Sequence, residues 1–405
     1  MINKQIVFRF SGETLRFNLS QSLFSSFAVD TGTELLLKTL AQRTRLGEWQ
    51  KAVDVGCGVG VIALCLKKRH PHLDVWALDR DALALVVARE NARLNHIRDV
   101  CFLGSLGLAD PMNGLSSQNW DLIAANIPAK AGVPVLESLI ESFSRRHTER
   151  GAVAIVTVAN LAQMVRQMIG TTGSEVVYSE STRSHTVFHF RRVSGKKAVG
   201  EQTFSLRPYI RRNAAFQGPH GEYSLKTVYD LPEFDTLGFR SRIAMELLEG
   251  LSRKGPFVIW NPGQGHLPVF LCHGRDAKGI NAKGRDAPGN GYVLAGRDLL
   301  ALEVSRLNLL ENGVRENNVR VLHTPFLDDL EEAAELLIYF PDENSSVQWY
   351  ATLLDSCSRL IERTGQLLVV SRSVHAFRLL QAMSSFTIMR DRKFHGFRGL
   401  VLEKA

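Results

Sequence analysis

Residues 79–95 read DRDALALVVARENARLN, and residues 296–312 read GRDLLALEVSRLNLLEN. Aligned without a gap, nine of the seventeen positions are identical, namely Arg80/Arg297, Asp81/Asp298, Leu83/Leu300, Ala84/Ala301, Leu85/Leu302, Val87/Val304, Arg89/Arg306, Asn91/Asn308 and Asn95/Asn312. The two stretches are separated by roughly 200 residues, which is too long for a solenoid repeat and is about the size of a domain. The sequence therefore predicts two copies of one domain.

The composition is that of an ordinary globular protein. Its 405 residues are 45% hydrophobic and 22% charged, which is enough for two domains that each bury a core. The net charge of +8 is compatible with an anionic partner, although many basic proteins bind no nucleic acid.

Cysteine usage and hydropathy indicate a reducing compartment. The five cysteines form no CxxC pair and are odd in number, which argues against a disulfide scaffold or a zinc site, so no metal is expected. The start MINKQIVFRF lacks the pattern of a secretion signal, and the most apolar stretch, AVAIVTVANLA (152–162), is too short to cross a bilayer. We therefore expect a cytoplasmic protein without membrane contact.

Strand and helix signals alternate along residues 1–192. After a hairpin signal at residues 5–20, the apolar stretches KAVDVG, DVWALD, VCFLGS, WDLIAANIP and AVAIVTV predict strands, with helices between them. This alternation is typical of an α/β fold in which a mostly parallel sheet has helices on both faces. Residues 174–192 predict two antiparallel strands at one edge. The expected domains are residues 1–192 and 222–405, joined by a basic linker over 193–221.

The stretch VDVGCGVG (53–60) predicts a turn that approaches a ligand. A buried strand ends near Asp54, and the glycines that follow allow the backbone to come close to a bound molecule before the next helix begins. Asp79 ends the next strand about twenty residues downstream, where an acid can accept hydrogen bonds from both hydroxyls of a ribose. Glycines alone also suit a tight turn, but strand, turn, helix and acid together favour a nucleoside cofactor.

The letters around this turn resemble a known family. The pattern D-x-G-x-G-x-G resembles motif I of class I S-adenosylmethionine-dependent methyltransferases, and DLIAANIPAKAG (121–132) ends the fourth strand where amino-directed members carry [DNS]-P-P-[YFW]. Together with VDTGTELLL (29–37), the chain resembles the MTS-type family of bacterial ribosomal-RNA guanine-N2 methyltransferases, which are tandem duplications. The resemblance implies two tandem Rossmann-like methyltransferase domains, S-adenosylmethionine as cofactor and RNA as substrate.

The resemblance also implies roles for individual residues. Residues before the first helix would close over the cofactor, the glycine turn would hold its methionine end, Asp79 would bind its ribose, and Ser105 would meet the adenine amine. The expected cofactor-binding set is Asp30, Thr31, Thr33, Asp54, Gly56, Cys57, Gly58, Gly60, Asp79, Arg80, Ser105 and Asn126. Cys57 is also a small residue that fills the turn, and Asp81 is expected to cap its helix.

Asn126, Ile127 and Pro128 are the expected catalytic residues. An exocyclic amine is a weak nucleophile because its lone pair is delocalised, so two oxygens that accept its hydrogens favour a tetrahedral nitrogen for in-line methyl transfer. The Asn126 side chain and the Ile127 backbone carbonyl could supply them. An asparagine before a proline also suits a plain turn.

The tetrapeptide departs from the family pattern. Ile127 replaces the first proline, and Ala129 replaces the aromatic ring that stacks on the base, a contact worth roughly 1–3 kcal/mol. Phe102 or Trp120 could supply a ring instead. Lys130 suits either a phosphate contact or a solvated loop.

The second copy lacks several residues that are expected to bind the cofactor or to catalyse transfer in the first copy. Matching Gly56 and Gly58 with Gly263 and Gly265 places Asn261 at the position of Asp54 and Leu267 at that of Gly60, while Gly296 replaces Asp79. Tyr339 and Phe340 precede Pro341, so the catalytic asparagine is absent as well. We expect no cofactor there and a structural or RNA-docking role, whereas the family usually keeps its C-terminal copy active.

Two further segments are rich in basic residues. Residues 273–292 form a glycine-rich insertion that suits either an RNA-contacting finger or a tolerated surface loop. The linker region 191–212 interleaves basic residues with Phe204 and Tyr209, which suits RNA contact or a solvated linker equally. Its basic residues are Arg191, Arg192, Lys196, Lys197, Arg207, Arg211 and Arg212.

The sequence therefore predicts an S-adenosylmethionine-dependent N-methyltransferase that acts on guanine-N2 of ribosomal RNA. The alternatives are a methyltransferase of a protein amide or small molecule, and an RNA-binding or assembly protein that retains the cofactor without turnover.

Overall fold

The chain folds into two compact units, Met1–Tyr209 and Ile210–Ala405. The computed structural model describes residues 2–23, 27–43, 48–108, 115–193, 205–219, 221–249, 251, 255–273, 291–331, 333–342, 349–383 and 385–405. The glycine-rich insertion expected at 273–292 lies almost wholly outside the described residues, as do Lys196, Lys197 and Phe204 of the linker.

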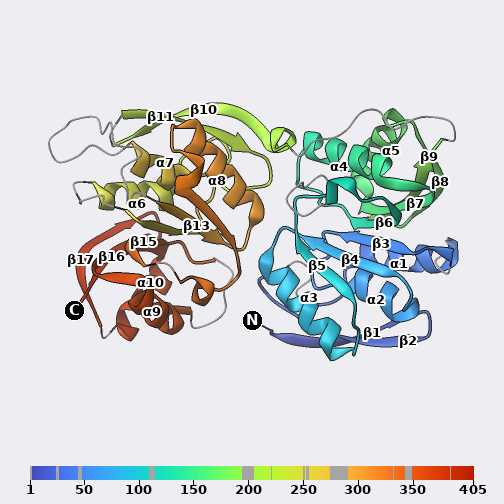
Figure 1. Cartoon of the computed structure of the whole chain (residues 1–405), viewed down its shortest axis with the longest axis horizontal. Helices are drawn as coiled ribbons and strands as arrows, with labels where there is room; N and C mark the ends of the chain where they lie inside the picture. The colour runs from blue at the N-terminus through green and yellow to red at the C-terminus, as the bar shows by residue number, and fades with distance from the viewer. Residues whose placement is uncertain are drawn as a thin grey trace. The chain divides into compact units, whose positions relative to one another are not determined.

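The first unit is a seven-stranded sheet preceded by a hairpin (Figure 1). The sheet has the order β5-β4-β3-β6-β7-β9-β8, and its strands are parallel except for β9, which pairs antiparallel with both neighbours. The strands are β1 (Lys4–Phe10), β2 (Glu13–Leu19), β3 (Lys51–Val55), β4 (Asp74–Asp79), β5 (Val100–Gly104), β6 (Trp120–Asn126), β7 (His147–Val158), β8 (Ser174–Ser181) and β9 (His185–Arg192). The predicted antiparallel edge at 174–192 is confirmed as β8 and β9.

Helices fill the connections between these strands. They are α1 (Thr31–Arg43), α2 (Val61–Arg69), α3 (Ala82–Leu94), α4 (Val133–Arg146) and α5 (Ala162–Thr171). The hairpin, α1, α2 and α3 share one apolar core with the sheet residues Ala52, Val75 and Leu122. Because side chains alternate along a strand, Val53 and Ile123, also fully buried, face the opposite side of the sheet. The expected α/β architecture with both sheet faces covered is confirmed.

The second unit repeats the plan (Figure 1). Its sheet has the order β14-β13-β12-β15-β16-β18-β17, with β18 antiparallel to both neighbours, so each strand has a counterpart in the first unit. The strands are β10 (Ile210–Gly218), β11 (Gly221–Val228), β12 (Phe257–Trp260), β13 (Tyr292–Gly296), β14 (Val319–His323), β15 (Ala334–Tyr339), β16 (Ile361–Arg372), β17 (Phe386–Phe394) and β18 (Phe397–Lys404). Its helices are α6 (Phe239–Leu248), α7 (His266–Cys272), α8 (Leu299–Glu311), α9 (Trp349–Leu360) and α10 (Ser373–Ala382).

The beginning of this unit differs from the expected boundary. Residues 210–218 were expected in the linker, but they form β10, which pairs with β11 as the counterpart of the β1–β2 hairpin. The segment is rich in basic residues and was therefore assigned to the linker. In β10, however, alternate side chains are exposed, while Ala214 and Phe216 face the core.

The asparagines that the two copies share fasten hairpin to helix in each unit. The Asn91 side chain accepts a hydrogen bond from the Asn18 amide at 2.7 Å and donates to the carbonyls of Asn18 and Val59 at 3.1 and 2.9 Å. Asn308 makes the same three bonds to Lys226 and Gln264, at 2.8, 3.1 and 2.7 Å. These two identical residues therefore stabilise the same scaffold in both units.

The shared aspartates have a local role in the same helices. Asp81 and Asp298 cap α3 and α8 by accepting hydrogen bonds from Leu83 and Leu300 at 2.9 and 3.0 Å. The expectation that Asp81 caps its helix is confirmed. Over the described ranges, no helix is both long and apolar enough to span a membrane.

Candidate functional site

The glycine turn of the first unit connects β3 to α2 and opens on one side. Gly56, Gly58 and Gly60 have φ angles of 77°, 53° and 87°, in the left-handed region that glycine adopts without strain. Among the described residues, a Cβ added to Gly56 or Gly58 would meet no atom within 4 Å, whereas one at Gly60 would lie 3.1 Å from Ala88 Cβ. Gly56 and Gly58 therefore border free space, and Gly60 permits α2 to pack against α3.

Asp54, in β3, presents a buried and partly unsatisfied carboxyl group beneath the turn. Its side chain is 1% exposed, and Oδ2 accepts a hydrogen bond from the Ala63 amide at 3.0 Å. Oδ1 is buried, and no donor among the described residues reaches it. Burial raises the pKa of Asp54 to about 7. An orphaned buried oxygen of this kind is suited to accept a hydrogen bond from a ligand.

Asp79 ends β4 and braces the turn. Its Oδ2 accepts from the Gly58 amide at 2.8 Å, and its Oδ1 accepts from the Asp81 amide at 2.9 Å. Burial raises the pKa of Asp79 to about 6, while these two bonds and the charge of Arg80 oppose the rise. A carboxylate offers about four acceptor positions, so two remain for a ligand.

Ser105 and Cys57 flank this acid. Ser105 follows β5, its amide donates to the Asp79 carbonyl at 3.0 Å, and its hydroxyl donates to the Gly107 carbonyl at 2.7 Å. The serine oxygen can still accept a bond from an amine. Cys57 is 7% exposed within the turn, and burial raises the pKa of its thiol far above its ordinary value.

Asn126 ends β6, beside β3, and contacts the start of α1. Its Nδ2 donates to Asp30 Oδ2 at 2.9 Å and to Thr33 Oγ1 at 3.1 Å. The Thr33 amide also donates to Asp30 Oδ2, at 3.1 Å. Thr31 is exposed, and its hydroxyl lies 3.3 Å from Nδ1 of His185 in β9. Asp30 and Thr33 were expected beside the cofactor, and the structure joins them to the expected catalytic residue.

The expected site residues thus gather at one edge of the sheet. Asp79, Asp54 and Asn126 come from the carboxyl-terminal halves of the neighbouring strands β4, β3 and β6. The chain order reverses between β3 and β6, and open α/β sheets bind ligands at such a switch point.

The tetrapeptide after β6 has no stacking ring. Ile127 is 5% exposed and its amide donates to the Val156 carbonyl at 3.0 Å, while Pro128, Ala129 and Lys130 are exposed. Neither ring named as a substitute is available. Trp120 is fully buried at the opposite end of β6, and Phe102 lies mid-strand in β5 with the Arg89 guanidinium 5.8 Å from its ring centre.

The corresponding turn in the second unit corrects the alignment of the two copies. The Asn261 amide donates to the Ala295 carbonyl at 2.8 Å, as the Gly56 amide does to Leu78 at 2.8 Å. Asn261, Gly263 and Gly265 have φ angles of 56°, 62° and 94°, which match those of Gly56, Gly58 and Gly60.

The expected placement of Asn261 at Asp54 and of Leu267 at Gly60 was therefore wrong by two residues. Matching glycine to glycine misled because an asparagine also adopts the left-handed conformation. The third glycine is present as Gly265, Ile259 replaces the buried acid Asp54, and Gly296 at the end of β13 does replace Asp79.

Side chains of the second turn occupy space that the first turn leaves open. Asn261 donates to the Phe340 carbonyl at 2.8 Å, and a Cβ at Gly296 would lie 2.6 Å from Asn261 Oδ1. An aspartate at position 296 therefore has no room unless Asn261 moves.

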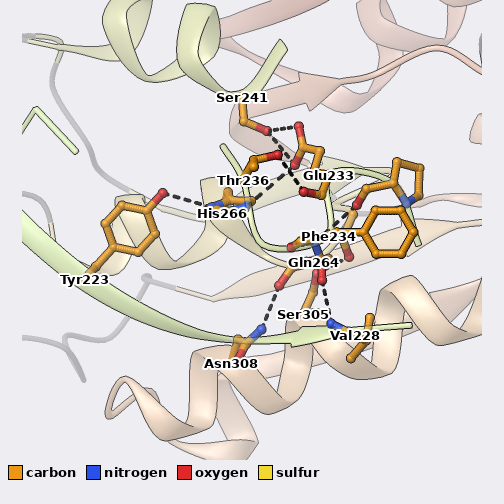
Figure 2. A network of polar contacts seen from close by, with 12 residues as sticks. Tyr223, Val228, Glu233, Phe234, Thr236, Ser241, Gln264, His266, Ser305 and Asn308 are labelled. Carbon is orange, nitrogen blue, oxygen red and sulfur yellow. Dashed lines mark hydrogen bonds and ion pairs between the residues drawn. The ribbon is translucent and has the colours of Figure 1, made fainter. Parts of the chain in front are cut away.

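Gln264 fastens a loop onto the same turn, as Figure 2 shows. Its side chain, 1% exposed, accepts from the Val228 amide at 2.8 Å and donates to the carbonyls of Pro232 and Phe234 at 3.2 and 2.8 Å. Beside it, the buried His266 lies 2.9 Å from the Tyr223 hydroxyl, and burial lowers the pKa of His266 to about 4.

Comparisons with known proteins agree over the first unit. Residues 14–189 match the model of a protein family described as methyltransferase small domain. The ribosomal RNA small subunit methyltransferase C of Haemophilus influenzae (strain PittGG) is 30% identical over 179 residues, which are 41% of this chain and 51% of that protein. The protein of the same name from Hahella chejuensis is 33% identical over 133 residues, 33% of this chain and 36% of that one. The chain spans about half the length of the first of these relatives.

A solved structure shares the fold of the two units. The T. thermophilus 16S rRNA N2 G1207 methyltransferase, solved with AdoMet and guanosine, superposes with a TM-score of 0.65 and 16% identity. The match covers 99% of this chain and 98% of that one, so the fold is shared along the whole chain.

Proposed function

We propose that this chain, whose residues 14–189 belong to the methyltransferase small domain family, is an S-adenosylmethionine-dependent methyltransferase acting on the exocyclic amine of guanine in ribosomal RNA. One observation carries the proposal. The buried Asp54, the half-buried Asp79 and Asn126 converge beside an open glycine turn at the switch point of the first sheet. The relatives named above act on ribosomal RNA by their names, which supports the substrate class.

The residues present fit the cofactor. Asp54 Oδ1 is a buried acceptor that no donor of the described residues reaches, and the open side of Gly56 and Gly58 leaves the backbone accessible. Asp79 retains two acceptor positions after its two backbone bonds, which suits the two hydroxyls of a ribose. Ser105 can accept from an adenine amine. Asp54 and the glycine turn would hold the methionine end.

The chain's own groups prepare the amine for reaction. Bound S-adenosylmethionine would supply a methyl group activated by a positively charged sulfur. Asn126 Oδ1 and the Ile127 carbonyl oxygen accept the two amine hydrogens and free the nitrogen lone pair from the ring. Orientation of this kind contributes to the rate without a residue that exchanges a proton during the transfer, and the extra proton of the methylated nitrogen then passes to water.

The second unit contributes by other means in this proposal. Asn261 crowds the place of the ribose acid, and Gln264 fastens a loop over the turn, so the second unit serves as scaffold and RNA-docking surface. Arg207 and Arg212 are exposed basic residues that suit phosphate contacts, and Arg212 also pairs with Asp235 at 3.4 Å. A ribosomal-RNA substrate places the enzyme in the cytoplasm.

Calorimetric titration with S-adenosylmethionine tests the cofactor, and labelled-methyl transfer to unmodified small-subunit ribosomal RNA tests the substrate. We expect micromolar binding that Asp79→Ala weakens about 100-fold, and label on a guanine N2 in the RNA. Absence of binding to the intact chain would remove the enzyme function. Binding with label on a protein amide and none on RNA would favour the alternative suggested by the missing ring at Ala129.

A further inference from the structure

We propose that Asp30 is a positioning residue that holds the Asn126 amide with its carbonyl oxygen toward the substrate amine. The inference rests on the proposed function and deepens it, because it explains how one side chain selects an amine. In this role Asp30 and Thr33 orient Asn126 toward the reacting amine and contribute little to cofactor affinity.

An asparagine amide has two faces of opposite chemistry. In one orientation the oxygen faces the substrate and accepts a hydrogen bond, and in the other the NH2 group faces it and donates. Only the first orientation helps an amine react, because a donor placed against an amine hydrogen repels it. The site therefore needs something that distinguishes the two ends of Asn126.

Asp30 makes that distinction by charge. An ionised carboxylate only accepts hydrogen bonds, so the end of Asn126 that faces Asp30 Oδ2 at 2.9 Å is its nitrogen. The second amide hydrogen goes to Thr33 Oγ1 at 3.1 Å. Both donors are then used within the protein, and Oδ1 is the only part of this side chain with capacity left for a substrate.

Asp30 is itself held before any ligand arrives. It precedes Thr31, the first residue of α1, and its Oδ2 accepts from the Thr33 amide at 3.1 Å, as a helix-capping residue does. The helix N-terminus favours the negative charge. A Cβ at Gly32 would lie 2.8 Å from the same Oδ2, so a glycine there lets the carboxylate stay in place.

This arrangement predicts which chemistry the site admits. A fixed acceptor at Asn126 binds a donor such as the N2 amine of guanine and disfavours the O6 carbonyl on the same base, which is an acceptor. The choice of nitrogen over oxygen then comes from Asp30 acting through Asn126, more than 90 residues away in sequence.

The test compares single-turnover methyl transfer to unmodified small-subunit ribosomal RNA with S-adenosylmethionine affinity, using the full chain. Asp30→Ala is expected to slow transfer about 100-fold, the scale of a 1 Å misplacement, and to leave the dissociation constant within about twofold. Asp30→Asn keeps a helix cap, so it folds, but it can donate to Asn126 and admit the wrong orientation. We expect a loss of about tenfold in rate, again with cofactor affinity retained.

Matched variants distinguish the positioning role from a general disturbance of the structure at the start of α1. Glu34→Gln removes an exposed carboxylate from the same helical turn and is expected to change neither quantity. Thr33→Val removes the second acceptor with little change of shape and is expected to slow transfer about tenfold, while Thr33→Ser retains the hydroxyl and restores the rate.

The possible results distinguish the positioning role of Asp30 from the methyltransferase function itself. Equal losses of rate and cofactor affinity in Asp30→Asn, or unchanged rates in Asp30→Ala, would overturn the positioning role while the enzyme function stands. No transfer by the unaltered chain, despite cofactor binding, would overturn both.

Discussion

The two glycine turns of this molecule have one backbone and different contents. In the first unit the turn borders free space and lies over the buried Asp54 and the half-buried Asp79. In the second unit the same φ angles recur, but Asn261 and Gln264 extend into the surroundings and Ile259 replaces a buried acid. The backbone of the turn is therefore common to both units. A few side chains around it determine whether the turn can bind a ligand.

The largest expected effect comes from the group that touches the substrate amine. Asn126→Ala is expected to lower the rate of methyl transfer about 1,000-fold, because the acceptor that prepares the nitrogen is lost. Cofactor affinity is expected to stay within about twofold. Single-turnover transfer and calorimetry measure the two quantities, and a rate unchanged by the substitution would remove Asn126 from the catalytic residues.

The cofactor acid gives the next effect. Asp79→Ala is expected to weaken S-adenosylmethionine binding about 100-fold, since two ribose hydroxyls lose charged partners. Calorimetry on the unaltered chain should give one site per chain, because Gly296 leaves the second unit without that acid. A stoichiometry of two would break the comparison, and Asp298→Ala, which removes the cap of α8, is the control.

The third residue of each turn, Gly60 or Gly265, is expected to contribute equally to stability in the two units. Gly60→Ala and Gly265→Ala are each expected to cost about 1–3 kcal/mol of unfolding free energy, because alanine is strained at positive φ. Each new Cβ would also lie 3.1 Å from an atom of α3 or α8. Thermal unfolding of the two variants measures the cost. A loss confined to Gly60→Ala would contradict the correspondence of Gly60 and Gly265.

The buried acid Asp54 predicts a pH dependence of stability in the first unit. Its pKa in the folded state is raised from 3.8 to about 7, so its favourable contribution is complete below about pH 4 and is lost as the pH rises toward 7. The slope is at most about 1.4 kcal/mol per pH unit. Denaturant unfolding of the cofactor-free chain between pH 4 and 8 measures it. Asp54→Asn should flatten that profile, and an unchanged profile would locate the titration elsewhere.

The smallest effect is expected where the second turn is made to resemble the first. Asn261→Gly restores the residue type of Gly56 and removes the side chain that crowds Gly296. Because the two acids are still missing, we expect one cofactor site per chain and an unchanged rate of transfer. Appearance of a second site in calorimetry would show that Asn261 alone had blocked it.

Much of the fold was predictable because it depends on local patterns. Apolar runs such as KAVDVG and AVAIVTV become central strands, and the repeated DALALVVARENARLN becomes α3, because burial on a parallel sheet requires those patterns. The identity of Asn91 and Asn308 was visible, but its purpose was not. Each asparagine bonds a hairpin more than 70 residues away, and sequence alone does not show such a partner.

The sequence by itself determined the duplication, the glycine turn and the acid that follows the next strand, since each depends on neighbours in the chain. Only the tertiary structure decided the register of the second turn, which depends on the φ angle of Asn261 and not on its letter. It also decided that Asp30 meets Asn126, because sheet order brings the end of β6 to the start of α1. A hydrogen bond is made by proximity in space, which sequence distance does not encode.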